Sequence, residues 1–155
     1  MAGRLQQEIQ QRKPIRLLEE ETTLNLARTA DLLMQRLADV LKPYALSATQ
    51  YNVLRILRGA GTEGASCKDI SSRMVTRDPD VTRMMDRLEV RGLVTRDRAK
   101  EDRRVVNHRL TPDGLDLVNS LDEPIEAIHG QSMRHMSRAK LRELINLLEE
   151  LRSGI

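Results

Sequence analysis

The sequence predicts a mainly α-helical protein that carries one small β-hairpin. Two tyrosines are the only aromatic residues, so the core has to be built from Leu, Ile, Val, Met and Ala. Such a core suits packed helices better than a β-sandwich or barrel. Apolar residues recur at helical spacing along most of the 155 residues. The pattern changes to short strand-like runs after Gly92.

Composition limits the environment of the protein. The net charge is +3, from 26 Lys and Arg against 23 Asp and Glu, and this total alone does not indicate a nucleic-acid partner. The single cysteine, Cys67, excludes an internal disulfide framework and fits a reducing cytosol. No stretch approaches the roughly 18 apolar residues of a membrane span, and the polar N-terminus does not resemble a signal peptide. We expect a cytoplasmic protein with one domain, residues 1–155, and no membrane partner.

The N-terminal part predicts a polar arm followed by a long helix. Residues 1–14 are polar and end in a proline, and we interpret them as a mobile or partner-dependent arm. A first helix is expected over about residues 15–42, and Pro43 ends it. The apolar positions that predict this helix are Leu26, Ala30, Leu33, Leu37 and Leu41.

Two capped helices and a tight turn follow. Ser47 and Gln50 form a capping box that begins a second helix, which runs to about Arg58. Ser66 begins a short third helix, and the tight turn is residues 75–77.

A fourth helix is expected after this turn. Asp78 is read as its N-cap and Pro79 as its first residue, and the helix runs to about Arg91. Two short helices joined by a turn of three or four residues are typical of a helix-turn-helix.

The hairpin and two further helices complete the chain. Strands are expected at 93–98 and 105–110, around a charged tip at 99–104, so the hairpin is typical of a wing. A fifth helix begins at Thr111-Pro112, and Pro124 should kink or break it. Ser137 caps a sixth helix, whose coiled-coil-like stripe is Leu141, Leu144, Leu148 and Leu151.

Positive charge is concentrated on the helix-turn-helix and the wing. Residues 73–109 contain eleven basic and seven acidic residues, a net charge of +4, and ten of the eleven are arginine. Arginine suits bidentate contact with phosphate and guanine. A run of mixed charge is more often a solvated face, and the helix dipole alone explains Arg87 and Arg91. The ordered series of helix-turn-helix, cap, hairpin and charged tip favours binding to double-stranded DNA.

The candidate DNA contacts follow from this geometry. The start of a recognition helix points at base edges, helix N-termini hold phosphates, and a basic wing tip enters the minor groove. The corresponding residues are Thr76, Arg77, Asp80, Thr82 and Arg83 at the recognition helix, Ser66 and Lys68 at the third helix, and Arg98, Lys100, Arg103 and Arg104 at the wing.

The same segment resembles the multiple antibiotic resistance regulator (MarR) family. The resemblance rests on VTRMMDRLE at 81–89, RGLV at 91–94, EDRR at 101–104 and LTPDG at 110–114. It implies a winged helix-turn-helix at about 47–111, with N- and C-terminal dimerisation helices at about 15–42 and 112–152. It also implies a homodimer that acts as a regulator, and many members of the family are repressors. Many of these are released from DNA by small aromatic acids and others by thiol oxidation or metals; for this chain the hypothesis is a small aromatic or apolar anionic effector.

The resemblance assigns roles to single residues. Thr82 and Arg83 would face the major groove, and Asp102 and Arg104 match the wing motif of the family. Arg104 would either enter the minor groove or tie the wing to Asp86, so that Asp86 and Asp102 would stabilise the wing. Acidic residues at 78 and 80 depart from the common pattern; Asp78 is best explained as a cap, and the role of Asp80 is open.

Other kinds of site have little support. Cys67 is better explained as a small buried hydrophobic residue than as a redox sensor. The three histidines lack metal-ligand spacing, so we expect no metal, no cofactor and no catalytic residue. One rival hypothesis is a winged helix that binds protein. A second is a metal or thiol sensor, which would still bind DNA but with a different switch. An effector pocket between the dimer helices and the DNA-binding lobe would be lined by Met34, Leu37, Tyr44, Tyr51 and Leu54, which could equally be plain core.

Overall fold

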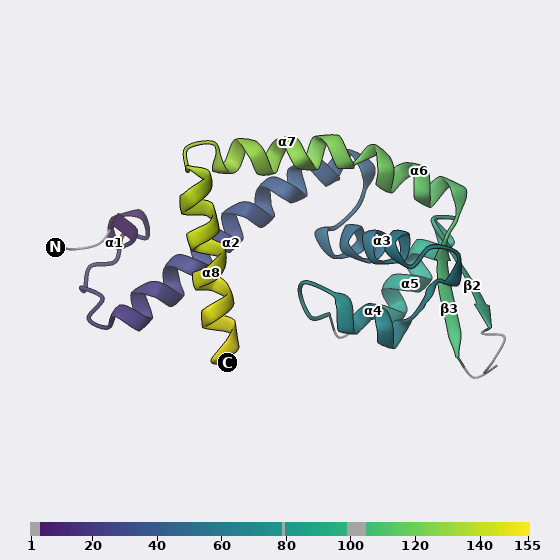
Figure 1. The fold of residues 1–155 in the computed structure, drawn as a ribbon, viewed down its shortest axis with the longest axis horizontal. Helices are drawn as coiled ribbons and strands as arrows, with labels where there is room; N and C mark the ends of the chain where they lie inside the picture. Colours follow the sequence, from purple (N-terminus) through teal and green to yellow (C-terminus); the bar gives the residue numbers. More distant parts are fainter. Residues whose placement is uncertain (1–3, 79, 99–104) are drawn as a thin grey trace.

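The computed structural model describes residues 4–78, 80–98 and 105–155, and it consists of helices with one small sheet (Figure 1). Helices α3, α4 and α5 gather with the sheet at one end of an elongated molecule. Helices α6 and α7 run along one side from this lobe to α8, which overlaps α2 in this view. The structure thus separates a winged lobe from long terminal helices.

The N-terminal segment contains a short helix that we did not expect. Helix α1 is Arg4–Glu8; its Leu5 is buried, and the helix contacts α2. Helix α2 is Leu18–Leu41, close to the predicted range, and Pro43 lies in the 3₁₀ turn η1, Lys42–Tyr44, that follows. One apolar residue therefore anchors part of a segment whose polar composition indicated only an arm.

The predicted helix-turn-helix is present. Helix α3 is Ala48–Ala60, and Ser47 and Gln50 form the expected capping box. The 3₁₀ turn η2, Gly61–Glu63, and strand β1, Ala65–Ser66, lead into α4, Cys67–Arg73. Helix α5, the recognition helix, is Val81–Val90.

The wing is a hairpin within a three-stranded antiparallel sheet. Strands β2, Val94–Arg98, and β3, Val106–Leu110, pair with Val94 opposite Leu110. Strand β1 adds to the other side of β3, so the order is β1-β3-β2. The hairpin prediction is confirmed; β1 was not predicted because two residues carry no strand pattern.

Three helices form the C-terminal part. Helix α6 is Pro112–Ser120, α7 is Asp122–Met133 and α8 is Arg138–Ser153. The predicted break is real, but it lies at Leu121. Pro124 falls in the first turn of α7, where the missing proline N–H removes no helical hydrogen bond.

The start of α6 is locked to the turn between α5 and β2. The Thr111 hydroxyl donates to the Gly92 carbonyl at 2.6 Å and accepts from the Gly114 amide at 3.0 Å. A Cβ at Gly114 would overlap the Leu93 carbonyl, so this close approach requires glycine. The winged lobe and α6 therefore meet in a tightly packed joint.

The core lies mainly in the winged lobe and its junction with α2, α6 and α7. Its fully buried side chains are Leu41, Val53, Leu54, Leu57, Ile70, Met85, Leu88, Val94, Val118 and Leu121. No residue of α8 is buried. Among the described helices, none has both the length and the apolar composition needed to cross a membrane.

Candidate nucleic-acid interface

Helix α5 has one buried face and one exposed face. Val81, Met84, Met85 and Leu88 are buried in the core. Thr82 is exposed, and the Arg83 side chain is 77% exposed. The apolar stripe thus fixes the helix, while residues that can contact base edges stay accessible to a groove.

The start of α5 differs from the prediction. The helix begins at Val81 with Asp80 as the N-cap residue, whereas we expected Asp78 to be the N-cap. The Asp78 carboxylate instead accepts from the Asp80 amide at 2.8 Å, a local turn that delays the helix by two residues. Pro79, the expected first helical residue, lies outside the described residues.

Asp80 makes an exposed ion pair with Arg83. Its Oδ2 lies 3.5 Å from Arg83 Nη1, and the Asp80 side chain makes no capping bond to the helix. Exposed pairs contribute at most about 1 kcal/mol, so this contact orients Arg83 without fixing it.

The turn before α5 is pinned from α3. The Val75 amide donates to Asn52 Oδ1 at 2.9 Å. The predicted contacts Thr76 and Arg77 follow this bond and are exposed. Asn52 could not be predicted as part of the site, because its partner lies 23 residues away and no local pattern links them.

The start of α4 is already occupied by a carboxylate. The Ser66 hydroxyl accepts from the Asp69 amide at 3.2 Å and donates to Asp69 Oδ2 at 2.6 Å, and this bond lowers the pKa of Asp69. Lys68 is exposed beside it. The Ser66 hydroxyl is thus engaged in capping, and Lys68 is the freer group for a phosphate.

Wing and recognition helix are joined by Arg96. Its Nη1 lies 3.4 Å from Asp86 Oδ1 and its Nε lies 3.1 Å from Glu89 Oε2. Asp86 therefore contacts the wing through β2. In the sequence, Arg96 is only one of the eleven basic residues of segment 73–109, and nothing local indicates this contact. Of the predicted wing contacts, Arg98 is exposed at the end of β2. The others, Lys100, Asp102, Arg103 and Arg104, lie outside the described residues.

Arg91 connects the end of α5 to the corner between α2 and α3. Its guanidinium donates to the carbonyls of Ala45 at 2.7 Å and Tyr44 at 2.9 Å. Ala45 has a positive φ of 51°, a conformation in which a residue with a Cβ is strained. The helix dipole alone is therefore an incomplete explanation of Arg91.

A depression of about 410 Å³ lies beside the recognition helix, and Cys67, Thr82, Asp86, Arg96 and His108 are among the residues that line it. Burial raises the pKa of the Cys67 thiol, and a hydrogen bond with Thr82 opposes this effect. Cys67 is half-buried, less than the sequence predicted, and packs against the core, so the structure favours a packing role for it.

His108 is buried, which lowers its pKa, and its Nδ1 has no hydrogen-bond partner among the described residues. Within the described ranges, no group of three His, Cys, Asp or Glu side chains is arranged to hold a metal.

The five candidate effector residues do not lie in similar environments. Leu37, Tyr51 and Leu54 are buried in the core, and Tyr44 packs against it. Met34 is exposed on α2. The alternative explanation as plain core fits the first three, and the effector pocket stays a prediction.

Comparison with known proteins gives the geometry a family context. Residues 46–106, which run from the start of α3 into β3, match the MarR family. A MarR transcription factor from Planctomyces limnophilus, of known crystal structure, is 41% identical; the alignment covers 87% of this chain and 98% of that one, with a TM-score of 0.67. The homoprotocatechuate degradative operon repressor of Escherichia coli is 27% identical over 86% of this chain and 88% of its own length.

A third relative comes from Bordetella bronchiseptica. This protein is BpsR, whose DNA binding is regulated by 6-hydroxynicotinic acid, and it is 25% identical. The alignment covers 89% of this chain and 97% of that one, with a TM-score of 0.79. The shared fold, the high coverage and the family match agree, and the chain belongs to the MarR family of transcription regulators.

Proposed function

We propose that this regulator is a repressor that binds a pseudo-palindromic operator as a homodimer. The observation that carries the proposal is the two-faced helix α5, which is locked by its apolar stripe and presents Thr82 and Arg83 to solvent. Arg83 suits bidentate contact with guanine, and Thr82 suits base or phosphate contact. By covering a promoter, the dimer would exclude polymerase.

Exposed apolar side chains on the terminal helices support the dimer. On α8, Leu144, Ile145, Leu147 and Leu151 are exposed, and Leu18, Leu32 and Met34 are exposed on α2. An apolar surface of this kind is typical of an interface between subunits. In this proposal residues 47–111 read DNA, and residues 15–42 and 112–152 hold the two subunits together.

The operator follows from the symmetry of a dimer. Two recognition helices in successive major grooves need half-sites about 10 base pairs apart, centre to centre. Selection of bound sequences from random duplex DNA should therefore recover an inverted repeat with this spacing. Recovery of one asymmetric half-site by a monomer would contradict the proposal, and weak binding without salt dependence would favour a protein-binding module.

Arg83 is the residue to test for sequence reading. Arg83→Ala should lower affinity for the selected operator by about 1–3 kcal/mol and relax the preference at one base position. Arg104→Ala should instead weaken binding to all sequences and reduce the salt dependence. Arg12→Ala, at an exposed position before α2 and outside the ranges proposed for DNA reading and dimerisation, is the control that removes the same charge and should leave both quantities unchanged.

An effector belongs to the proposal as well, since BpsR responds to a small aromatic acid. A small aromatic or apolar anionic ligand would bind near Met34, Leu37, Tyr44, Tyr51 and Leu54, and change the spacing of the two recognition helices. Thermal-shift and operator titrations with a panel of aromatic carboxylates test this. If no ligand alters either measurement, the effector part is wrong and the DNA-binding part is unaffected.

A further inference from the structure

Positive charge gathers at a second place, the turn between α7 and α8. Residues 134–142 contain four Arg and Lys and one His, and no acidic residue. Their net charge of +4 equals that of the whole segment 73–109, while the rest of the chain has a net charge of −5. The turn joins two of the terminal helices and lies away from the recognition helix α5 in the structure (Figure 1).

An open depression of about 520 Å³ lies at this turn. Among the residues that the structure describes, five side chains that can donate hydrogen bonds line it and no carboxylate does. They are Arg36 of α2 together with Gln131, Ser132, Arg134 and His135, which we call the basic corner. Pockets of roughly 300–1,000 Å³ are typical of small-molecule sites. The size and the lining therefore suit a small ligand that accepts hydrogen bonds.

The basic corner is partly preorganised. Arg36 Nη1 donates to Ser132 Oγ at 3.2 Å, which connects α2 to α7 across 96 residues of sequence. The Ser132 hydroxyl in turn donates to the Ile128 carbonyl at 2.7 Å. Because the hydroxyl is held by its own helix, it positions one guanidinium at the depression.

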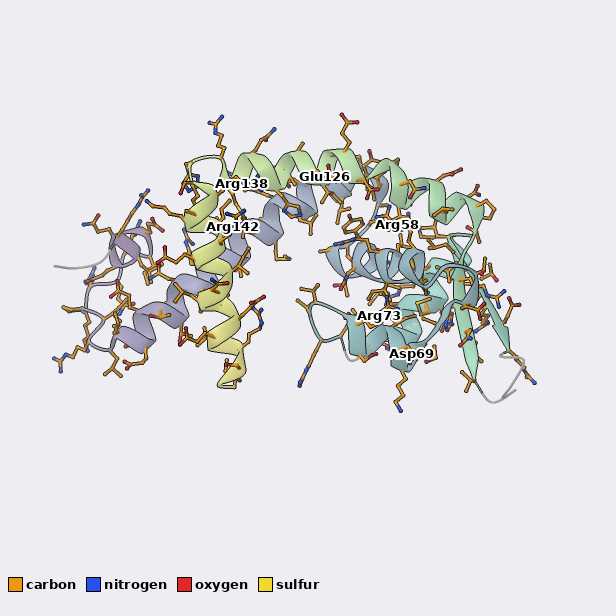
Figure 2. The ribbon with its side chains drawn as sticks, in the orientation of Figure 1. Arg58, Asp69, Arg73, Glu126, Arg138 and Arg142 are labelled. Atoms are coloured by element: carbon orange, nitrogen blue, oxygen red, sulfur yellow. The ribbon has the colours of Figure 1, made fainter. Side chains whose placement is uncertain are left out.

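Helix stability does not explain the charge. Arg134 follows the C-terminus of α7, where a cation is favourable, but Arg138 and Lys140 lie in the first turn of α8, where the helix dipole disfavours cations. Figure 2 shows Arg138 and Arg142 at the end of α8 that adjoins the turn. Within residues 4–78, 80–98 and 105–155, no ion pair involves any of these cations or Arg36.

We infer that the basic corner binds a small polyanion, a compact molecule with two or more negative charges carried by phosphate or carboxylate groups. Arg36 and Arg134 supply two guanidinium forks, which match the oxygens of such groups. The Gln131 amide and the His135 ring add further donors. The bound anion would offset the mutual repulsion of the cations and strengthen the contact between α2 and α7. This inference does not depend on DNA binding.

Calorimetric titration of the full chain tests the site. Pyrophosphate and citrate, at constant ionic strength, represent the two kinds of anionic group. We expect saturable binding of at least one of them, one per chain, with a Kd below about 1 mM. Arg36→Gln with Arg134→Gln should weaken it at least about tenfold. The control Arg12→Gln with Arg16→Gln removes the same charge from exposed positions and should change Kd less than about twofold.

Several outcomes would overturn the inference. One is the absence of saturable binding up to about 10 mM of either anion. Another is equal weakening by the control pair, which would mean that overall charge alone attracts the anion. A third is that the double variant changes the oligomeric mass of the protein, and the dependence of that mass on salt, without changing anion affinity. The corner would then be a contact between subunits. Single Arg134→Gln serves if the double variant is unfolded by circular dichroism, and it should still lower the affinity.

Discussion

The winged lobe and the terminal helices differ in where their apolar side chains lie. In the lobe, Leu54, Ile70 and Leu88 are fully buried by other parts of the same chain. In α8, Leu144, Ile145 and Leu147 remain exposed although the helix is long and well capped. The difference teaches that the lobe is stabilised from within, whereas the terminal helices leave exposed the apolar surface on which the proposed dimer depends.

The largest effect should come from the core of the lobe. Leu54→Ala removes a fully buried side chain of α3 and should lower the free energy of unfolding by about 2–5 kcal/mol. Urea denaturation followed by circular dichroism measures it. Val90→Ala, at an exposed position of α5, is the control and should change stability by less than about 0.5 kcal/mol. Equal effects of the two changes would remove the distinction between core and surface.

The second prediction concerns the apolar face of α8. If the proposed dimer forms through this face, Leu144→Glu with Leu151→Glu should weaken it about 100-fold or more, because each carboxylate would have to be buried against apolar surface. Sedimentation at several concentrations measures the dissociation constant. Asn146→Glu with Ser153→Glu adds the same charge to the same helix and should have a much smaller effect. An unchanged dimer in the leucine double variant would show that this face is not the interface.

The third prediction concerns the contact between the two regions. Arg91→Met removes both hydrogen bonds to the carbonyls of Tyr44 and Ala45, and should cost about 1–2 kcal/mol of stability. Arg87→Met, one turn earlier on α5, is the matched control and should cost less than about 0.5 kcal/mol. The midpoints of denaturant-induced unfolding of the two variants measure this difference. If the midpoints coincide, Arg91 does not stabilise the junction.

The smallest expected effect is a pH dependence of stability that arises in the winged lobe. Burial lowers the pKa of His108 in the folded protein, so the unfolded chain binds its proton first as pH falls. Stability should therefore decline from about pH 7 toward pH 5, at a rate of at most about 1.4 kcal/mol per pH unit.

His108→Gln should flatten this decline, whereas His129→Gln, at an exposed position, should leave it unchanged. Asp69 and Asp122 have lowered pKa values, so their stabilising contributions are lost only below about pH 4, outside this range. A decline of the same slope in His108→Gln would mean that another group is responsible.

Local signals in the sequence predicted most of the fold. The Ser47 capping box, the cap and proline at Thr111-Pro112, and the strand-like runs of the wing each act within a few residues, and each element formed where expected. The start of α5 was misplaced because the Asp78 carboxylate could either cap a helix or form a turn, and both patterns look alike in sequence.

The supporting contacts of the candidate site were not predictable in the same way. Arg96 reaches Asp86 and Glu89 only after β2 has packed beside α5. Arg91 meets the Ala45 carbonyl 46 residues away. Such contacts depend on how elements pack in three dimensions, and arginines are too common in this segment for composition to single out the two that act as connectors.

Strand β1 has a consequence for regulation. Ser66, the N-cap residue of α4, pairs with Asn107 of β3. The start of α4 is therefore bonded to the wing. Together with the Arg96 contacts, this pairing leads us to expect that the winged lobe moves as one rigid body. In the proposed dimer, a signal that acts on the terminal helices would then alter the distance between the two winged lobes without changing the structure within each lobe. Footprinting on operators with lengthened or shortened spacers, with and without an effector, tests this. The effector should change the spacing that the protein prefers and leave its preferred bases the same.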